Sequence, residues 1–251
     1  ASSNFIGAYS GTGHLLIENG GSLTASSGHL GQYDGSLGTL TVTGTGSLYD
    51  VNYLDIGGTG GGSYSATGIL TIANNGVVDV DSAIRIAEFV GTTGIVNIGA
   101  AEGDAAQAAG IIQSNGYELR FGAGSASLVF NHTDNAYSFS TPITGTGQLR
   151  QLAGTTILSG ANTWSGLATV EGGELRAGGA GTLSSGNPFV VNGGTLNFNG
   201  FNHTIAELSG TGGMVALGSS TLTVNQASNT SYAGVISGSG GLTKSGTGAL
   251  T

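Results

Sequence analysis

Apolar and polar residues alternate along most of the chain in short segments that are separated by Gly and Asn. The segments GTLTV at 38–42, GILTI at 68–72 and GIVNI at 94–98 place Leu, Ile or Val at every second position. A period of two is the spacing of side chains on one face of a β-strand, so each segment predicts a strand with one buried face. Residues with high helix propensity gather only at 100–109, where we expect a short helix or a loop.

An opening glycine followed by alternating apolar residues recurs along the first half of the chain. Copies begin at Gly13, Gly38, Gly68 and Gly94, which lie 25, 30 and 26 residues apart. In each copy we expect a second short strand after a Gly turn and a third further on, for example at 54–56. Three short strands in each unit predict a three-sided coil whose apolar face only a stacked neighbour can cover. A β-sandwich is the alternative fold, but it would not explain the recurring opening.

The second half of the chain repeats on a shorter unit. The segment TVEGGEL at 169–175 returns as VVNGGTL at 190–196, 21 residues later, and a variant follows at 217–224. With these unit lengths, 251 residues make about ten coils. The predicted fold class is therefore all-β, a right-handed parallel β-helix (solenoid) of about ten coils.

Composition narrows the function classes. The chain has 251 residues with no Cys, which excludes disulfides and thiolate metal sites. Its 5 Lys and Arg cannot form a phosphate-binding face, so we expect no nucleic-acid partner. No apolar run is long enough for a membrane-spanning helix. Charge is uneven, because residues 1–135 carry 11 acidic and 2 basic side chains, whereas residues 136–251 carry 3 of each.

A longer motif begins near residue 145. Residues 145–149 read GTGQL, residues 153–166 read AGTTILSGANTWSG and residues 170–175 read VEGGEL. Together they resemble the passenger-associated transport repeat of Gram-negative autotransporters, the type V secretion family. Gln151 stands near the usual Lys of that repeat and Trp164 at its usual Tyr, so this copy is divergent.

A second copy of the motif begins at residue 238, and the chain stops inside it. The resemblance implies a passenger domain outside a Gram-negative cell, either anchored at the outer membrane or released. It also implies that further coils and a C-terminal outer-membrane β-barrel follow downstream, and that the repeats help passenger folding and export. We therefore expect acidic, irregular β-helix coils at 1–135. At 136–251 we expect β-helix coils with the transport repeat, truncated in its second copy.

Few residues offer catalytic chemistry. Asp79 and Asp81 lie two positions apart and so face the same side of one strand. With Glu102 or Asp104 nearby they could serve as paired acid and base or bind Ca²⁺, and with Arg85 they could serve a carbohydrate-active β-helix enzyme. We favour a solvated acidic strip. The histidines of the chain are His14, His29, His132 and His203. They are too far apart in the sequence to show the spacing of a metal-binding motif. We expect no catalytic residue, no metal and no cofactor.

Tyrosines close to acidic residues are the best candidates for a partner-binding surface. The predicted surface comprises Tyr49, Asp50, Tyr53, Asp55, Asp79 and Asp81. Because solenoid faces let many weak polar contacts add, we predict an adhesin or a self-association stalk in aggregation and biofilm formation. The expected partner is a host surface or matrix protein, a glycan, or another copy of the chain. The alternatives are a virulence effector released to act on host cells and the carbohydrate-active enzyme named above.

Overall fold

The structure is built from short parallel strands. The computed structural model describes residues 4–58, 65–183 and 186–251, and among these residues it contains strands but no helix. No helix in the described part is therefore long and apolar enough to cross a membrane. The strands form two compact units, which are described separately below.

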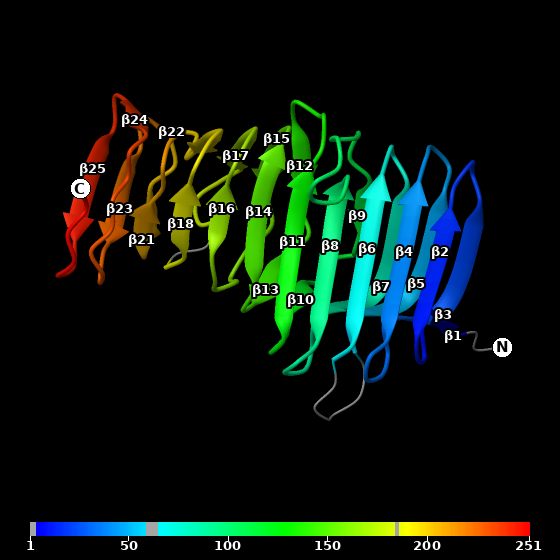
Figure 1. Cartoon of the computed structure of the whole chain (residues 1–251). Helices are drawn as coiled ribbons and strands as arrows, with labels where there is room; N and C mark the ends of the chain where they lie inside the picture. The colour runs from blue at the N-terminus through cyan, green and yellow to red at the C-terminus, as the bar shows by residue number, and fades with distance from the viewer. Residues whose placement is uncertain (1–3, 59–64, 184–185) are drawn as a thin grey trace. The chain divides into compact units, whose positions relative to one another are not determined.

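Unit 1 comprises residues 1–133 and 141–147, and its described residues form two parallel sheets. One has the order β1-β3-β5-β7-β10-β13, with β9 also paired to β7, and the other has the order β2-β4-β6-β8-β11. Figure 1 shows the strands of the second sheet side by side and pointing the same way. The strands of unit 1 are β1 (Asn4–Ile6), β2 (Thr12–Ile17), β3 (Ser22–Leu30), β4 (Leu37–Thr43), β5 (Leu48–Ile56), β6 (Thr67–Ala73), β7 (Val77–Ile86), β8 (Thr93–Gly99), β9 (Ile111–Gln113), β10 (Leu119–Phe121), β11 (Ser125–Asn131) and β13 (Ile143–Gly145).

The recurring openings of the sequence stack in register. Leu40 pairs with Leu70 and Leu70 with Val96, so equivalent residues of successive coils form one ladder. Val42 and Ile72 form a second ladder two positions on. All five side chains have 0% of their surface exposed. Burying an aliphatic side chain of this size contributes about 1.5–3 kcal/mol, so these ladders are the core of the unit.

The opening glycine is required by close contact with the turn before it. A Cβ on Gly38 would lie 2.2 Å from the backbone nitrogen of Gly31, and a Cβ on Gly68 would lie 2.3 Å from that of Gly57. Real Cβ atoms do not approach backbone so closely, so a side chain here would push the turn away from the strand. The fifth rung carries Ala126 at this position, in register with Gly94.

Unit 1 differs from the three-strand coil that the sequence predicts. The expected second and third strands are continuous, because β3, β5 and β7 run for 9, 9 and 10 residues. In β5 the fully buried aliphatic positions are Val51, Leu54 and Ile56, with Asn52 and Tyr53 both turned outward. Two successive outward residues turn the strand at a corner without breaking its hydrogen bonds. The prediction of separate second and third strands is therefore wrong for this unit.

Residues 100–109 form a loop. Asn131 Nδ2 donates to the carbonyl oxygens of Ala101 (2.9 Å) and Asp104 (3.1 Å), which anchors the loop at its start. Isolated bridges tie its end, joining Ala109 to Ala73 and Gln107 to His132. Of the two expectations for this segment, helix or loop, the structure has the loop.

Unit 2 comprises residues 134–140 and 148–251 and has three parallel sheets in the described residues. Their orders are β12-β15-β17-β19-β22-β24, β14-β16-β18-β21 and β20-β23-β25. The strands of unit 2 are β12 (Tyr137–Phe139), β14 (Gln148–Ala153), β15 (Thr155–Leu158), β16 (Ala168–Val170), β17 (Glu174–Ala177), β18 (Pro188–Val191), β19 (Thr195–Asn197), β20 (His203–Ile205), β21 (Glu207–Ser209), β22 (Met214–Gly218), β23 (Thr221–Asn225), β24 (Val235–Gly238) and β25 (Gly241–Ser245).

The shorter repeat also stacks as the sequence predicts. Val170 pairs with Val191, and Leu175 pairs with Leu196, so the copies at 169–175 and 190–196 lie on neighbouring coils. Here the three sides of a coil are separate strands, in contrast to unit 1. The predicted fold class, an all-β parallel β-helix, is confirmed.

Substituting Gly68 by Ala tests the close turn. Because the new Cβ would meet backbone, Gly68→Ala is expected to destabilise the chain by about 1–3 kcal/mol in chemical denaturation. Gly241→Ala is the control, since its Cβ would lie 3.6 Å from its nearest neighbour, Thr221 Oγ1. Equal unfolding midpoints for the two variants would contradict this explanation of the repeat.

Candidate functional site

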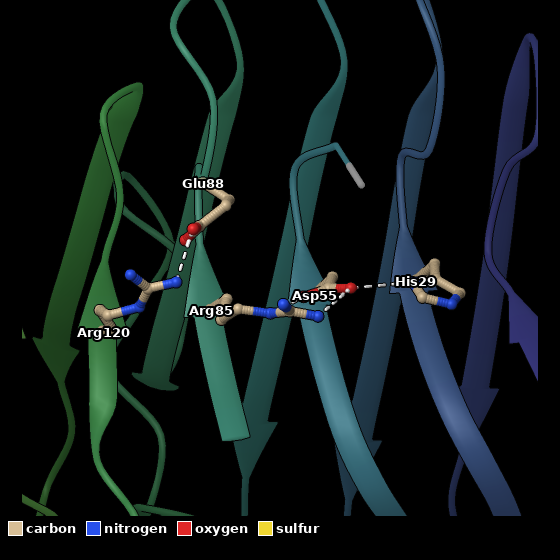
Figure 2. A network of polar contacts seen from close by, with 5 residues as sticks. All are labelled: His29, Asp55, Arg85, Glu88 and Arg120. Atoms are coloured by element: carbon tan, nitrogen blue, oxygen red, sulfur yellow. Dashed lines mark hydrogen bonds and ion pairs between the residues drawn. The ribbon is translucent and has the colours of Figure 1, made fainter. Parts of the chain in front are cut away.

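A row of charged side chains crosses the outward positions of β3, β5, β7 and β10. His29 pairs in register with Asp55, Asp55 with Arg85, and Arg85 with Arg120. Each residue follows an inward position of its strand, so the parallel ladder places one charged group beside the next. Figure 2 shows these side chains together with Glu88.

Asp55 lies at the centre of this row. Its carboxylate accepts hydrogen bonds from His29 Nδ1 (3.1 Å) and from Arg85 Nε (2.5 Å) and Nη2 (3.0 Å). Tyr53 packs against both donors, with the Arg85 guanidinium 5.4 Å from its ring centroid and the His29 ring 5.6 Å away. Asp55 is only 3% exposed. A buried carboxylate with this many donors acts as a link between coils.

Glu88 and Arg120 form a second link. Arg120 Nη2 donates to Glu88 Oε1 at 2.5 Å, joining the turn after β7 to β10 (Figure 2). Both arginines of residues 1–135 are thus engaged by carboxylates of the preceding coil. The remaining acidic residues of this region have no arginine or lysine of the region to neutralise them.

An acidic face lies further along the same sheet, formed by Asp50, Asp79 and Asp81. Asp50 and Asp79 are register partners on β5 and β7. Thr24 Oγ1 donates to Asp50 (3.3 Å), and Asn115 Nδ2 donates to Asp79 (3.3 Å) and Asp81 (2.8 Å). All of these donors are neutral, so the negative charge of the face is not compensated.

The pKa of Asp79 is affected by its position in the acidic face. Partial burial and the neighbouring charges of Asp81 and Asp50 raise the pKa of Asp79 above its ordinary value. The hydrogen bond from Asn115 acts in the opposite direction but does not cancel them. The charged form of Asp79 is therefore less favourable in the folded state than in the unfolded chain.

Two residues of the predicted partner-binding surface are buried. Tyr49 has 0% of its surface exposed, and burial raises the pKa of its hydroxyl. Its ring fills the space above Gly28, where a Cβ would lie 2.1 Å from the Tyr49 hydroxyl oxygen. Asp55 is buried between His29 and Arg85. The expected surface position is wrong for these two residues, whose roles are in packing and in linking coils.

The other four residues of that prediction remain accessible. Asp50 and Tyr53 are half-buried, Asp79 is half-buried and Asp81 is exposed. Tyr53 already packs on Arg85. Partner binding at the acidic face stays a prediction.

The sequence offers two chemical alternatives for Asp79 and Asp81, an enzyme site with Arg85 and a Ca²⁺ site. Arg85 bonds to Asp55 rather than to the carboxylates of the acidic face. Among the described residues, no group of three or more His, Asp or Glu side chains could hold a metal ion. Each histidine has its own surroundings: His14 bonds Thr39, His29 bonds Asp55, His132 packs on Phe130 and His203 bonds the carbonyl of Phe201.

Sequence reasoning missed the link through His29, Asp55 and Arg85. These residues lie 26 and 30 residues apart, which are spacings of the coil repeat itself. Comparing outward positions one repeat apart would have brought opposite charges together. The sequence contains these opposite charges one repeat apart, but they can be matched only when the register of the strands is known.

Comparison with known proteins finds relatives along most of the chain. The chain is 35% identical over 199 residues to the uncharacterised lipoprotein YdeK of Escherichia coli K12, and the match covers 74% of this chain and 14% of the relative. It is 32% identical over 263 aligned residues to the adhesin BmaC autotransporter of Brucella suis biovar 1, covering 92% of this chain and 8% of the relative. It is 34% identical over 171 residues to the uncharacterised protein YuaQ of Escherichia coli K12, covering 66% of this chain and 11% of the relative.

The chain thus spans a small fraction of the relatives that it matches. No family model matches it, and no solved structure is significantly similar. The similarity to an autotransporter adhesin agrees with the resemblance to passengers that the sequence motif suggests. It does not identify the transport repeat in particular.

Substituting Asp55 tests the buried link. Asp55→Asn removes a charge from between two donors, and we expect a loss of about 1–3 kcal/mol in stability because a hydrogen bond to a charged group is lost in a buried place. Asp104→Asn is the matched control, since it makes the same change on the exposed loop. Unfolding midpoints in denaturant measure both, and a Asp55→Asn variant as stable as its control would show that the link is not needed.

The raised pKa of Asp79 predicts that the stability of the chain depends on pH. A folded-state pKa above the unfolded value means that charging Asp79 destabilises the fold, and that protonation removes this effect as pH falls through the raised pKa. Asp79→Asn is therefore expected to be more stable than the native chain at pH 7, by about 0.5 kcal/mol given solvent screening. The difference should vanish below the unfolded pKa of about 3.9, where both states are protonated. Thermal midpoints across this range would refute the account if Asp79→Asn were the less stable at pH 7.

Proposed function

We propose that this chain is part of an autotransporter passenger that stands on the surface of a Gram-negative cell and mediates adhesion. The observation that carries the proposal is the similarity, over 92% of the chain, to an autotransporter adhesin. That share is large enough to include coils of both units, so the similarity is not one local motif.

The fold suits this role physically. Each face of a β-helix unit repeats the same outward positions at the strand spacing of about 4.8 Å. Contacts that are weak singly add when several rungs engage one partner, whether a matrix protein, a glycan or a second copy. The acidic face formed by Asp50, Asp79 and Asp81 offers such a row of acceptors with uncompensated charge, which favours a basic segment of a host matrix protein as its partner.

The transport-repeat motif forms part of the same proposal. Its distinctive side chains are buried: Gln151 is 0% and Trp164 1% exposed, and Asn162 Nδ2 donates to the carbonyl oxygen of Thr182 at 2.7 Å. Gln151 Nε2 donates to the carbonyl oxygen of Ala153 at 2.7 Å. Buried residues that hold turns would help coils form in sequence, so we propose that the motif serves folding and export and that Asp50, Asp79 and Asp81 serve binding.

Cells that display the chain within its full-length protein test the adhesive role. We expect them to attach to wells coated with extracellular matrix several-fold more than cells without the protein. Asp79→Asn combined with Asp81→Asn should reduce attachment towards the background, because the acidic face loses two charges. Glu102→Gln combined with Asp104→Asn, which removes two charges from the exposed loop, should leave attachment unchanged.

Two outcomes would count against the proposal. Equal attachment with and without the protein would overturn the adhesive function. Equal losses in the two double variants would mean that overall charge matters rather than the acidic face. Settling of cell suspensions, measured in parallel, separates attachment to matrix from association between cells.

A further inference from the structure

Asn is followed directly by Gly at several turns of the chain, and such pairs can modify themselves. The backbone nitrogen of Gly can attack the side-chain carbonyl carbon of the preceding Asn, because Gly has no side chain to hinder the approach. The attack needs a Gly N–H that is free of other partners and a turn with room to move. The pairs are Asn19–Gly20, Asn75–Gly76, Asn115–Gly116, Asn192–Gly193 and Asn199–Gly200.

In three of these pairs the Gly N–H is already a hydrogen-bond donor. Gly20 donates to Ser47 Oγ at 3.2 Å. Gly76 and Gly193 donate to backbone carbonyl oxygens at 2.8 and 3.3 Å. A Cβ on Gly76 would lie 2.5 Å from a backbone oxygen, and one on Gly193 2.4 Å, so these two turns are also closely packed. Each of the three nitrogens must break a hydrogen bond before it can attack.

Asn115 and Gly116 are the central residues of an open turn between β9 and β10. Tyr117 N donates to the carbonyl oxygen of Ser114 at 2.7 Å, and φ is 48° at Asn115 and 88° at Gly116, which fits a type I′ turn. No described residue accepts a hydrogen bond from the N–H of Gly116. Residues 115–118 are exposed, and a Cβ on Gly116 would meet no atom within 4 Å. The attacking nitrogen is therefore free, unhindered and in contact with water.

The side-chain amide of Asn115 is held only at the surface. Its Nδ2 donates to Asp81 at 2.8 Å and to Asp79 at 3.3 Å, and both hydrogen bonds are exposed. Water can replace exposed hydrogen bonds at little cost, so the amide can leave the carboxylates and turn towards Gly116.

The pair Asn199–Gly200 is the other one whose Gly N–H has no acceptor among the described residues. Its amide is held more firmly, because Asn199 Nδ2 donates to the carbonyl oxygen of Ala177 at 3.1 Å in a partly buried place. Its turn is also less free, since a Cβ on Gly200 would lie 3.4 Å from Ser219 Oγ. Asn115 thus has the most favourable surroundings of the five.

We propose that Asn115 is a site of spontaneous deamidation in the folded chain. A bond forms between Gly116 N and Asn115 Cγ while the proton of that nitrogen passes to hydroxide. The bond from Cγ to Nδ2 then breaks, and Nδ2 takes a proton from water and leaves as ammonia. Water opens the resulting five-membered imide at either carbonyl, which gives aspartate or isoaspartate at position 115. The net reaction consumes water, releases ammonia and needs no enzyme.

The product changes the acidic face formed by Asp50, Asp79 and Asp81. A carboxylate at position 115 cannot donate, so Asp79 and Asp81 lose the amide that bonds both of them. The new charge has the same sign as theirs and repels them. The negative charge of this face therefore increases as the protein ages. The deamidation does not depend on the adhesive role proposed above.

Incubation of the purified chain at mildly alkaline pH, followed by mass spectrometry of its peptides, tests the site. We expect the peptide with Asn115 to show the mass of a deamidated residue several-fold sooner than the peptides with the other four pairs. An isoaspartate methyltransferase should label the same peptide. In a parallel sample unfolded in urea the five pairs should react at similar rates, because only their local sequences then differ. Asn115 protected by folding as strongly as Asn75 would overturn the proposal.

Ser47→Ala tests why the pairs differ. Asn19 and Gly20 form a turn that matches the one at Asn115, with φ of 56° and 76°, but the N–H of Gly20 is bonded to Ser47. Removal of the Ser47 hydroxyl should make Asn19 deamidate several-fold faster and leave Asn115 unchanged. Urea unfolding midpoints show whether the variant keeps its fold. An unchanged rate at Asn19 in a folded variant would overturn the explanation by the free N–H.

Asn115→Asp tests the consequence for the acidic face. The variant carries one product of the reaction, and we expect a lower thermal midpoint at pH 7 than for Asn19→Asp, which makes the same change in the matching turn. The difference should narrow as pH falls and the carboxylates become protonated. Equal midpoints of the two variants at pH 7 would show that deamidation does not disturb the acidic face. Neither result depends on whether cells attach to matrix, so failure here is distinct from failure of the adhesive role.

Discussion

The stacking of one coil on the next is the constraint on which the rest of this structure depends. A single coil exposes its apolar face, and only the ladders of Leu, Ile and Val between neighbours remove that face from water. Parallel hydrogen bonds hold the same register, so inward positions cannot change without loss of both packing and pairing. Outward positions are not bound in this way. The chain can therefore vary its surface chemistry, rung by rung, on a nearly fixed interior.

The register of the strands also determines which charged side chains stabilise the fold and which destabilise it. Equivalent outward positions of adjacent rungs lie about 4.8 Å apart, so the residue one repeat away becomes an unavoidable neighbour. Where that neighbour has the opposite sign, as Asp55 has beside Arg85, the coils are linked. Where it has the same sign, as Asp50 has beside Asp79, its charge adds to partial burial and to the charge of Asp81 in raising the pKa of Asp79, and stability is lost. At the acidic face the inward residues stack as the fold requires, whereas the outward carboxylates repel one another.

Most of the coil architecture could be predicted from the sequence, because its period and its alternation are direct consequences of stacking. The openings at Gly38 and Gly68 and the shorter repeat at 169–175 all fall in the predicted register. The corners could not be predicted, since a strand that turns through Asn52 and Tyr53 has the same local composition as one that stops. Tyr49 was misplaced for a related reason. Its position two residues from Val51 points inward, but the space for its ring exists only because Gly28 leaves it, and that contact joins different coils.

In unit 2, His203 breaks the rule of apolar stacking at an inward position of β20, as Gln151 does beside Val170 on β14. His203 occupies the place that Leu222 and Leu242 fill on the following rungs, and its Nε2 acceptor is buried without a partner. A polar group in such a column lowers stability, and the neighbouring coils show that an apolar residue fits there. Positions where a chain breaks the local rules that the rest of it obeys are expected to be functional or strained sites. The surroundings of His203 show strain of this kind, because its ring packs on Phe198 and its Nδ1 bonds the carbonyl oxygen of Phe201, whereas its Nε2 stays enclosed without a partner. Burial accordingly lowers the pKa of this imidazole, since the charged ring would be still less favourable there.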